Sequence, residues 1–187
     1  TEYIGPQRVK ELCPIIALDG PRYPVLGALW QPRGGTARHD AVAWGYARAC
    51  SDMGMDTIQK CEVTGVERDG DRVTGVQTTK ARIGTKKLGI VVAGHSGVLA
   101  DMAGFRLPVE SVALQALVSE PIKPCMDVVV MANTVHGYLS QSDKGEMVIG
   151  GGTDSHNNYT QRGSFHHIEE TVRALVETFP MLARLKM

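Results

Sequence analysis

Four short apolar runs separated by turn residues decide the fold: VALQALVS at 112–119, VVVMA at 128–132, VHGYLS at 135–140 and EMVIG at 146–150. Short runs rich in β-branched and apolar residues, bounded by turn residues, are typical of strands. The polar sequence SDKG, from Ser142 to Gly145, joins the last two runs and favours a hairpin turn. We therefore expect strands and a hairpin across this part of the chain.

An amphipathic helix is predicted after these strands. Apolar residues recur on one helical face of the next segment, at Phe165, Ile168, Val172, Leu175, Val176 and Phe179. Ser164 is a suitable N-cap, and Pro180 stops the helix because proline cannot continue it. We expect this helix to return to the core.

A second helix is predicted from Asp40 to Gly54. Its apolar residues are also spaced to lie on one face: Val42, Tyr46, Ala49, Cys50 and Met53. Asp40 is a plausible N-cap, and Gly54 can adopt the left-handed conformation that ends a helix. His39 therefore lies immediately before the predicted N-terminus.

Shorter elements are predicted on either side of this helix. Strand-like runs at 55–61, 63–68, 72–78 and 81–88, with a tight turn at Asp69-Gly70-Asp71, predict a small antiparallel meander. The apolar run from Ile90 to Gly94 indicates a strand buried on both faces, and Ser96 to Ala103 a short helix. Residues 1–35 contain five prolines, which favour turns and short extended pieces from Leu12 to Arg33. The whole pattern predicts an α+β (mixed α/β) fold.

Composition excludes several classes of function. The 20 Lys and Arg residues balance 20 Asp and Glu residues, so the net charge of zero offers no electrostatic footprint for nucleic acid or an anionic membrane. No apolar run approaches the roughly 20 residues that span a bilayer. The four cysteines lie far apart without a CxxC pair, which is typical of reduced thiols in a cytoplasmic protein.

Motifs for metal, nucleophilic or phosphate chemistry are not found. His166 and His167 are adjacent on a helix and diverge by about 100°, so we expect no shared metal ion. Gly94-His95-Ser96-Gly97 lacks the Gly-x-Ser-x-Gly elbow of hydrolases. The glycines at 150–152 follow a strand but lead into a polar loop, whereas a phosphate-binding loop leads into a helix.

Arg33 to Asp40 is the most suggestive polar segment. Backbone N–H groups at the start of the predicted helix, together with Arg33 and Arg38, would attract an anion such as a phosphate. His39 lies within this environment. An incidental histidine in a surface turn is the alternative interpretation of the same residues.

The run GGTARHDAVAWGYA at 34–47 resembles the β subunits of heterotetrameric sarcosine oxidases, which are amino-acid-oxidase-like FAD-dependent oxidoreductases. Other segments resemble the same family: 62–66, 105–110, 114–121, 140–146 and 159–166. The resemblance implies an FAD-binding domain interleaved with an antiparallel-sheet substrate domain. It assigns 1–104 to a partial FAD-binding region with the flavin-attachment segment and the meander, 105–163 to the substrate domain, and 164–187 to the returning helix.

The resemblance also implies two flavins. The histidine matching His39 carries a covalent FMN in the family, attached through the flavin 8α-methyl group, with Arg38 and Asp40 beside it and Gly34 and Gly35 before it. Val63, Gly94 and His95 match residues beside a non-covalent FAD, at which sarcosine is oxidised before electrons pass to FMN. The family's opening Gly-x-Gly-x-x-Gly unit is absent, so we expect an incomplete FAD site in a piece of a longer protein.

Tyr138 is the candidate catalytic residue. His136, Tyr138 and Ser140 alternate along one strand and so share a face, where the family's substrate sheet faces the flavin. Such a face suits a small N-methylated amino acid, although a solvated sheet face has the same pattern.

Three functions follow from this sequence. The first is a component of a flavin-dependent sarcosine oxidase that assembles with other subunits and is inactive alone. The second is a cofactor-free α+β interaction module. The third is a related amine oxidase or dehydrogenase that acts on dimethylglycine or glycine.

Overall fold

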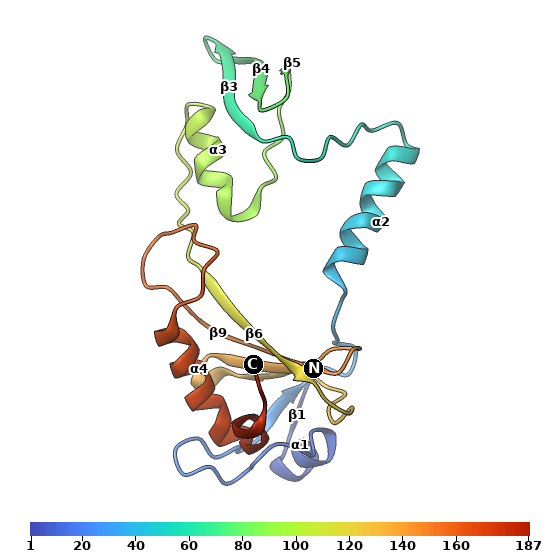
Figure 1. Ribbon diagram of the computed structural model, residues 1–187, viewed down its shortest axis with the longest axis vertical. Helices are drawn as coiled ribbons and strands as arrows, with labels where there is room; N and C mark the ends of the chain where they lie inside the picture. The colour runs from blue at the N-terminus through green and yellow to red at the C-terminus, as the bar shows by residue number, and fades with distance from the viewer. The chain divides into compact units, whose positions relative to one another are not determined.

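The computed structural model describes all residues from Thr1 to Met187 and contains two compact units (Figure 1). Unit 1 consists of Thr1–Thr36, Ala113–His156 and Thr160–Met187. Unit 2 consists of Ala37–Val112 and Asn157–Tyr159. The domain boundaries drawn from the sequence at residues 104 and 163 stay a prediction about the longer protein.

A four-stranded antiparallel sheet forms the centre of unit 1. Its order is β6-β9-β8-β7, where β6 is Leu114–Pro121, β7 is Val130–Ala132, β8 is Gly137–Gln141 and β9 is Glu146–Thr153. The four strands predicted from the sequence are thus confirmed, with small shifts at their ends. Ser142 and Gly145 close the β8–β9 hairpin through the Gly145 N–H, which donates to the Ser142 carbonyl at 3.0 Å. The mixed helix and sheet content confirms the predicted fold class.

One face of this sheet packs against helix α4, Phe165–Thr178, which is followed by the 3₁₀ turn η3, Pro180–Arg184. Five side chains at this contact are completely buried: Leu139, Met147, Ile149, Leu175 and Phe179. The predicted helix is confirmed. Ser164 is its N-cap residue, although the Ser164 side chain makes no capping hydrogen bond.

A ribbon of two strands completes unit 1. β1, Glu2–Ile4, pairs antiparallel with β2, Ala28–Trp30, and the extended and turn character predicted for this proline-rich region is confirmed. The sequence reasoning missed helix α1, Pro6–Leu12, in which Pro6 occupies the first turn, where its missing N–H is not needed. Val9, Cys13 and Ile16 add to the buried core.

Unit 2 contains a three-stranded meander and two helices. β3, Val63–Asp69, pairs with β4, Arg72–Thr78, which pairs with β5, Arg82–Gly84, and these strands were predicted. The strand predicted at 55–61 is wrong: the segment is irregular, and Met55 and Ile58 are 49% and 53% exposed because no strand pairs with them.

The buried strand predicted at 90–94 is also wrong. The 3₁₀ turn η1, Ala93–His95, follows an irregular stretch in which Val91 is 94% exposed. An apolar run forms a buried strand only where neighbouring strands supply hydrogen bonds and cover, and unit 2 supplies neither here. The short helix predicted next is present as α3, Ser96–Met102.

Helix α2 spans His39–Asp52 and begins before the predicted position. Arg38 is the N-cap residue and Asp40 lies in the first turn, so the prediction of Asp40 as N-cap is wrong. Gly54, with φ of 90°, ends the helix as predicted: its N–H donates to Ser51, and the N–H of Met55 donates to Cys50.

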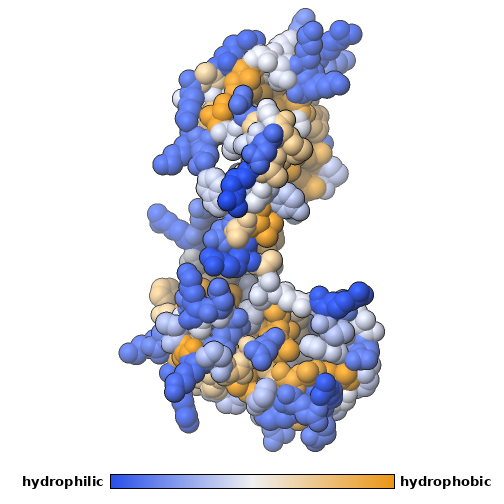
Figure 2. Space-filling model, turned by 90° about the vertical axis from the view of Figure 1, so that its right-hand side faces the viewer, coloured by the Kyte–Doolittle hydropathy of each residue, from blue (hydrophilic) through white to orange (hydrophobic).

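The apolar stripe of α2 is not covered within the structure. No residue of α2 is buried: Val42 and Tyr46 of the stripe are 46% and 72% exposed, and Met53, which caps the helix, is 79% exposed. Exposed apolar side chains contribute to the orange areas of the surface in Figure 2.

None of the helices is both long enough and apolar enough to cross a lipid bilayer.

Candidate functional site

The start of α2 carries three of the predicted site residues. Arg38 Nη2 lies 3.5 Å from Asp40 Oδ2, and both side chains are more than half exposed. His39 is exposed as well. A hydrogen bond from the Ala41 N–H lowers the pKa of the Asp40 carboxyl, and the positive charge of Arg38 acts in the same direction. Asp40 therefore offsets part of the positive potential that the sequence predicted at this helix end.

Gly34 and Gly35 belong to unit 1 and lie in the turn after β2. The Gly34 N–H donates to the Gln31 carbonyl at 3.0 Å. Both glycines line a groove of about 810 Å³ whose other walls come mainly from β1, β2, β7 and the residues beside them. A Cβ atom at Gly35 would meet no atom within 4 Å, so neither packing nor a positive φ accounts for this glycine.

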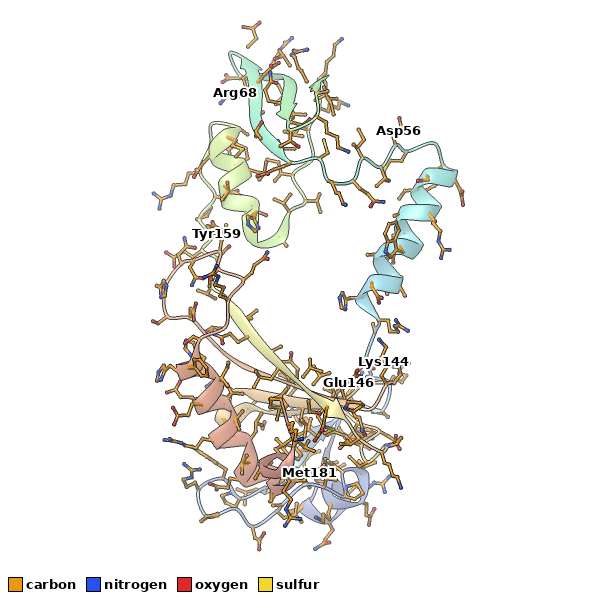
Figure 3. All side chains as sticks on the ribbon, in the orientation of Figure 1. Asp56, Arg68, Lys144, Glu146, Tyr159 and Met181 are labelled. Carbon is orange, nitrogen blue, oxygen red and sulfur yellow. The ribbon has the colours of Figure 1, made fainter.

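Gly94 and His95 are held in unit 2 by residues distant in sequence. The Ser111 hydroxyl donates to the Gly94 carbonyl, and the Ser111 N–H donates to Asn157 Oδ1 at 3.2 Å. The ring of His95 lies 5.0 Å from the ring of Tyr159, which Figure 3 shows beside α3. Sequence reasoning missed Ser111, Asn157 and Tyr159 because no local pattern joins residues 46 positions apart.

Val63 is the first residue of β3 and pairs with Thr78 of β4. The far end of β3 is joined to α3 by Arg68, whose Nη1 donates to the Ala103 carbonyl at 2.8 Å (Figure 3). This bond satisfies a carbonyl at the C-terminus of α3, where a positive charge is favourable. The meander and α3 therefore form one packed group within unit 2.

Tyr138 lies half-buried on the face of the unit 1 sheet opposite α4. Ser140 shares this face, but His136 does not, because it precedes β8 and has a φ of 50°. The prediction that His136 shares this strand face is wrong for that reason. Gly150 of β9 lies directly opposite Tyr138 and was not singled out as a site residue.

The two histidines of α4, His166 and His167, lie close to carboxylates. His167 Nε2 lies 3.0 Å from Asp154 Oδ1, and His166 Nε2 lies 3.4 Å from Glu170 Oε1. The structure contains no cluster of three or more His, Cys, Asp or Glu side chains that could hold a metal ion.

Comparison with known proteins identifies the family. A family model described as FAD dependent oxidoreductase matches residues 1–187. The chain belongs to this family.

Relatives within the FAD-dependent oxidoreductases share high identity with the chain. Sarcosine oxidase subunit beta of Rhodobacter capsulatus is 72% identical over all 187 residues, which are 45% of that protein. Sarcosine oxidase subunit beta of an Arthrobacter species is 55% identical over 184 residues, covering 98% of the chain and 45% of the relative. The chain thus spans about half the length of these relatives.

Solved FAD-dependent oxidoreductase structures match the fold over nearly the whole chain. The L-proline dehydrogenase of P. horikoshii superimposes with a TM-score of 0.89 at 23% identity, covering 99% of this chain and 50% of that chain. The glycine oxidase of Bacillus cereus gives a TM-score of 0.77 at 16% identity, and the match covers 99% of this chain and 50% of the glycine oxidase chain. At these identities the likeness concerns the fold.

Proposed function

We propose that this chain is the part of a sarcosine oxidase β subunit that carries the flavin-attachment segment and the substrate-facing sheet. The whole protein would oxidise sarcosine, a small secondary amino acid. The observation that carries this proposal is the 72% identity over all 187 residues with the R. capsulatus subunit. Other subunits of a hetero-oligomeric oxidase are its partners in this proposal, because the relatives are themselves named as subunits.

His39 is the proposed attachment residue for FMN. His39 is exposed, so its ring nitrogens are accessible for a covalent bond. Arg38 and the N–H groups of the first turn of α2 would offset the negative charge of a phosphate, while Asp40 orients Arg38 through their ion pair. A flavin bound here supplies the capacity to accept and pass on electrons.

The proposed FAD contacts are Val63, Gly94 and His95, whereas Gly34 and Gly35 precede the proposed FMN-attachment residue in the sequence. Two of these glycines fit a ligand that approaches the backbone closely. A Cβ atom at Gly94 would meet only Ser111 Oγ, at an ordinary 3.6 Å, and one at Gly35 would meet nothing. Since neither residue has a positive φ, a closely bound group is a physical reason for glycine at both positions.

Tyr138 is the proposed substrate contact. It projects from the sheet face that α4 leaves open, and its phenol offers one hydrogen-bond donor to a carboxylate or amine. The neighbouring side chains on this face are small or apolar, which suits a substrate as small as sarcosine. We also propose a cytoplasmic location, since all four cysteines are unpaired and reduced thiols are usual there.

A related amine oxidase that acts on glycine is the second candidate. The glycine oxidase of Pseudomonas putida is 26% identical over 124 residues, and the B. cereus glycine oxidase shares the fold. The much lower identity favours sarcosine. Anaerobic mixing of the assembled enzyme with sarcosine, dimethylglycine or glycine distinguishes the three substrates, because only the true substrate bleaches the visible flavin absorbance rapidly.

Attachment at His39 is tested in the full-length subunit assembled with its partners. We expect visible flavin absorbance and added mass that remain with the polypeptide after acid denaturation. His39→Ala should lose the covalent flavin, whereas the control His166→Ala, at an exposed site on α4, should keep it. A colourless, unmodified wild-type polypeptide from the assembled enzyme would refute the attachment and favour a cofactor-free module.

A further inference from the structure

Three consecutive glycines occupy the end of β9, and each is glycine for a different physical reason. Gly152 has a φ of 71°, a conformation that side chains other than glycine rarely adopt. Gly150 and Gly151 do not lie in this left-handed region. The space around Gly150 and Gly151 must therefore explain why both residues lack a side chain.

Gly151 is required by the backbone of the neighbouring strand. A Cβ atom there would lie 2.5 Å from the His136 carbonyl oxygen and 2.9 Å from the Gly137 Cα. These atoms belong to the main chain beside β8 and cannot move without separating the two strands. Gly151 therefore has a purely structural role, on the sheet face that packs against α4.

Gly150 is required only by the ring of Tyr138. A Cβ atom at Gly150 would lie 2.3 Å from Cε1 and Cζ of Tyr138 and 2.4 Å from its hydroxyl oxygen. The two residues are directly opposed in the β8–β9 ladder, so their Cβ directions share one face. The Tyr138 ring consequently lies down across β9, in the space that a side chain at Gly150 would fill.

The ring belongs to a short row that crosses the open face. Met131, Tyr138, Gly150 and Ala116 are successive partners across β7, β8, β9 and β6. Met131 is 63% exposed, so the row is not covered within unit 1. Gly150 and Ala116 are the small members of the row, and the phenol end of Tyr138 lies over Gly150.

We propose that Gly150 is a positioning residue that sets the height of the Tyr138 ring above the sheet and thereby the size of amino acid that fits over it. This inference rests on the proposed function, in which the open face contacts the substrate. A methyl group at position 150 would lift the ring away from β9. The lifted ring occupies space above the sheet. A substrate with a larger N-substituent therefore loses more binding affinity than sarcosine does.

The test compares sarcosine with N-ethylglycine in the full-length, assembled enzyme. Selectivity is measured as kcat/KM for sarcosine divided by kcat/KM for N-ethylglycine. We expect Gly150→Ala to raise this ratio by about tenfold, which is the size of effect that one methylene has in a tight pocket. The decrease in kcat/KM for N-ethylglycine should come mainly from a higher KM. The effect should persist when Tyr138 is replaced by Phe, which keeps the ring, and disappear in a Tyr138→Leu background.

A second readout does not depend on turnover. A fluorinated tyrosine placed at position 138 should show a shifted ¹⁹F resonance in Gly150→Ala, because the ring leaves its position over β9. The ring end can rotate, so the melting temperature of Gly150→Ala should stay within about 4 °C of wild type. The control Gly151→Ala should lower the melting temperature further, because its clash is with backbone atoms.

The outcomes separate this inference from the proposed function. Wild-type enzyme that does not oxidise sarcosine refutes the proposed function and the substrate role of Gly150 with it. If the wild-type enzyme oxidises sarcosine, three results would overturn the positioning role alone. These are an unchanged selectivity in Gly150→Ala, an unshifted fluorine resonance in that variant, or an equal effect of Gly150→Ala on selectivity in the Tyr138→Leu background.

Discussion

The carboxylate of Glu177 on α4 binds the loop around Arg22 with both of its oxygens. Oε2 accepts a hydrogen bond from Arg22 Nε at 2.6 Å, and Oε1 accepts from the backbone N–H groups of Arg22 and Tyr23 at 2.7 Å and 2.9 Å. The Glu177 side chain is only 10% exposed, and it joins segments 155 residues apart. This contact fixes the loop that leads into β2 against the end of α4.

We expect this contact to make unit 1 sensitive to acid. Burial tends to raise the pKa of Glu177, but the hydrogen bonds from the Arg22 side chain and from the two N–H groups outweigh it, so the pKa lies below its ordinary value of 4.5. A carboxylate with a lowered pKa stabilises the fold above the unfolded-state pKa, and this stabilisation is lost as the pH falls through the folded-state pKa. Urea unfolding at a series of pH values below 7 measures the loss.

Glu177→Gln tests the same contact at fixed pH. The variant should unfold at lower urea concentration than wild type at pH 7, and its stability should change less on acidification. Glu11→Gln is the matched control, because Glu11 pairs with Arg8 at the surface and its side chain is 63% exposed. Parallel acid profiles for wild type and Glu177→Gln would show that another group causes the acid sensitivity.

The buried face of the sheet should dominate the stability of unit 1. Leu139 of β8 is completely buried in the core of unit 1, so Leu139→Ala should cost about 2 to 5 kcal/mol of unfolding free energy, from lost burial and a residual cavity. Val118 lies on the open face and is 53% exposed, so Val118→Ala should cost less than about 1 kcal/mol. Chemical denaturation of both variants checks the difference, and equal losses would contradict the assignment of the two faces.

The sequence predicted the sheet and α4 because their pattern is complete within the chain. Each strand of unit 1 pairs with a neighbour, and the completely buried apolar residues Leu139, Met147 and Ile149 share one face, as expected for a sheet covered on one side. Ser142 to Gly145 supply the turn chemistry that sets the hairpin. Local preference and tertiary contacts agree here, so the pattern alone was sufficient.

Prediction failed where apolar residues have no partner in the chain. The runs at 55–61 and 90–94 have the composition of strands, yet no strand pairs with either, and Val91 is 94% exposed. The stripe of α2 was predicted correctly as helical, but its apolar face is not buried. Periodicity indicates which residues can be buried, whereas burial itself depends on which surfaces are available to cover them.

The candidate site was only partly accessible to sequence reasoning. His39 was singled out by its position at a predicted helix start and Tyr138 by strand parity, the family resemblance supplied their roles, and these roles stay proposals. Gly150 was missed because its importance depends on the register between β8 and β9, which brings it under the Tyr138 ring. Ser111 was missed because its contact with Gly94 joins an irregular segment to η1. Both contacts are tertiary and leave no local signal.

Two glycines of similar openness should respond to alanine with opposite signs. A Cβ atom at Gly45, inside α2, or at Gly54, at its end, would meet no atom within 4 Å, but Gly54 has a φ of 90°. Gly45→Ala should stabilise the helix by up to about 1 kcal/mol, and Gly54→Ala should destabilise its end by about 1 kcal/mol. Circular dichroism of the two variants measures the change in helicity, and a change of the same sign in both would refute this account.

Thiol reactivity should separate Cys13 from Cys50. Cys13 is 1% exposed, and burial raises the pKa of its thiol although the N–H groups of Ile15 and Ile16 partly oppose this. Alkylation requires an accessible thiolate, so Cys13 should react with iodoacetamide at pH 8 more than about tenfold more slowly than the half-exposed Cys50 of α2. Peptide mass spectrometry at successive times gives both rates. In urea the two rates should converge, since unfolding removes the burial that distinguishes them, and equal rates in the folded protein would show that the core around Cys13 opens readily.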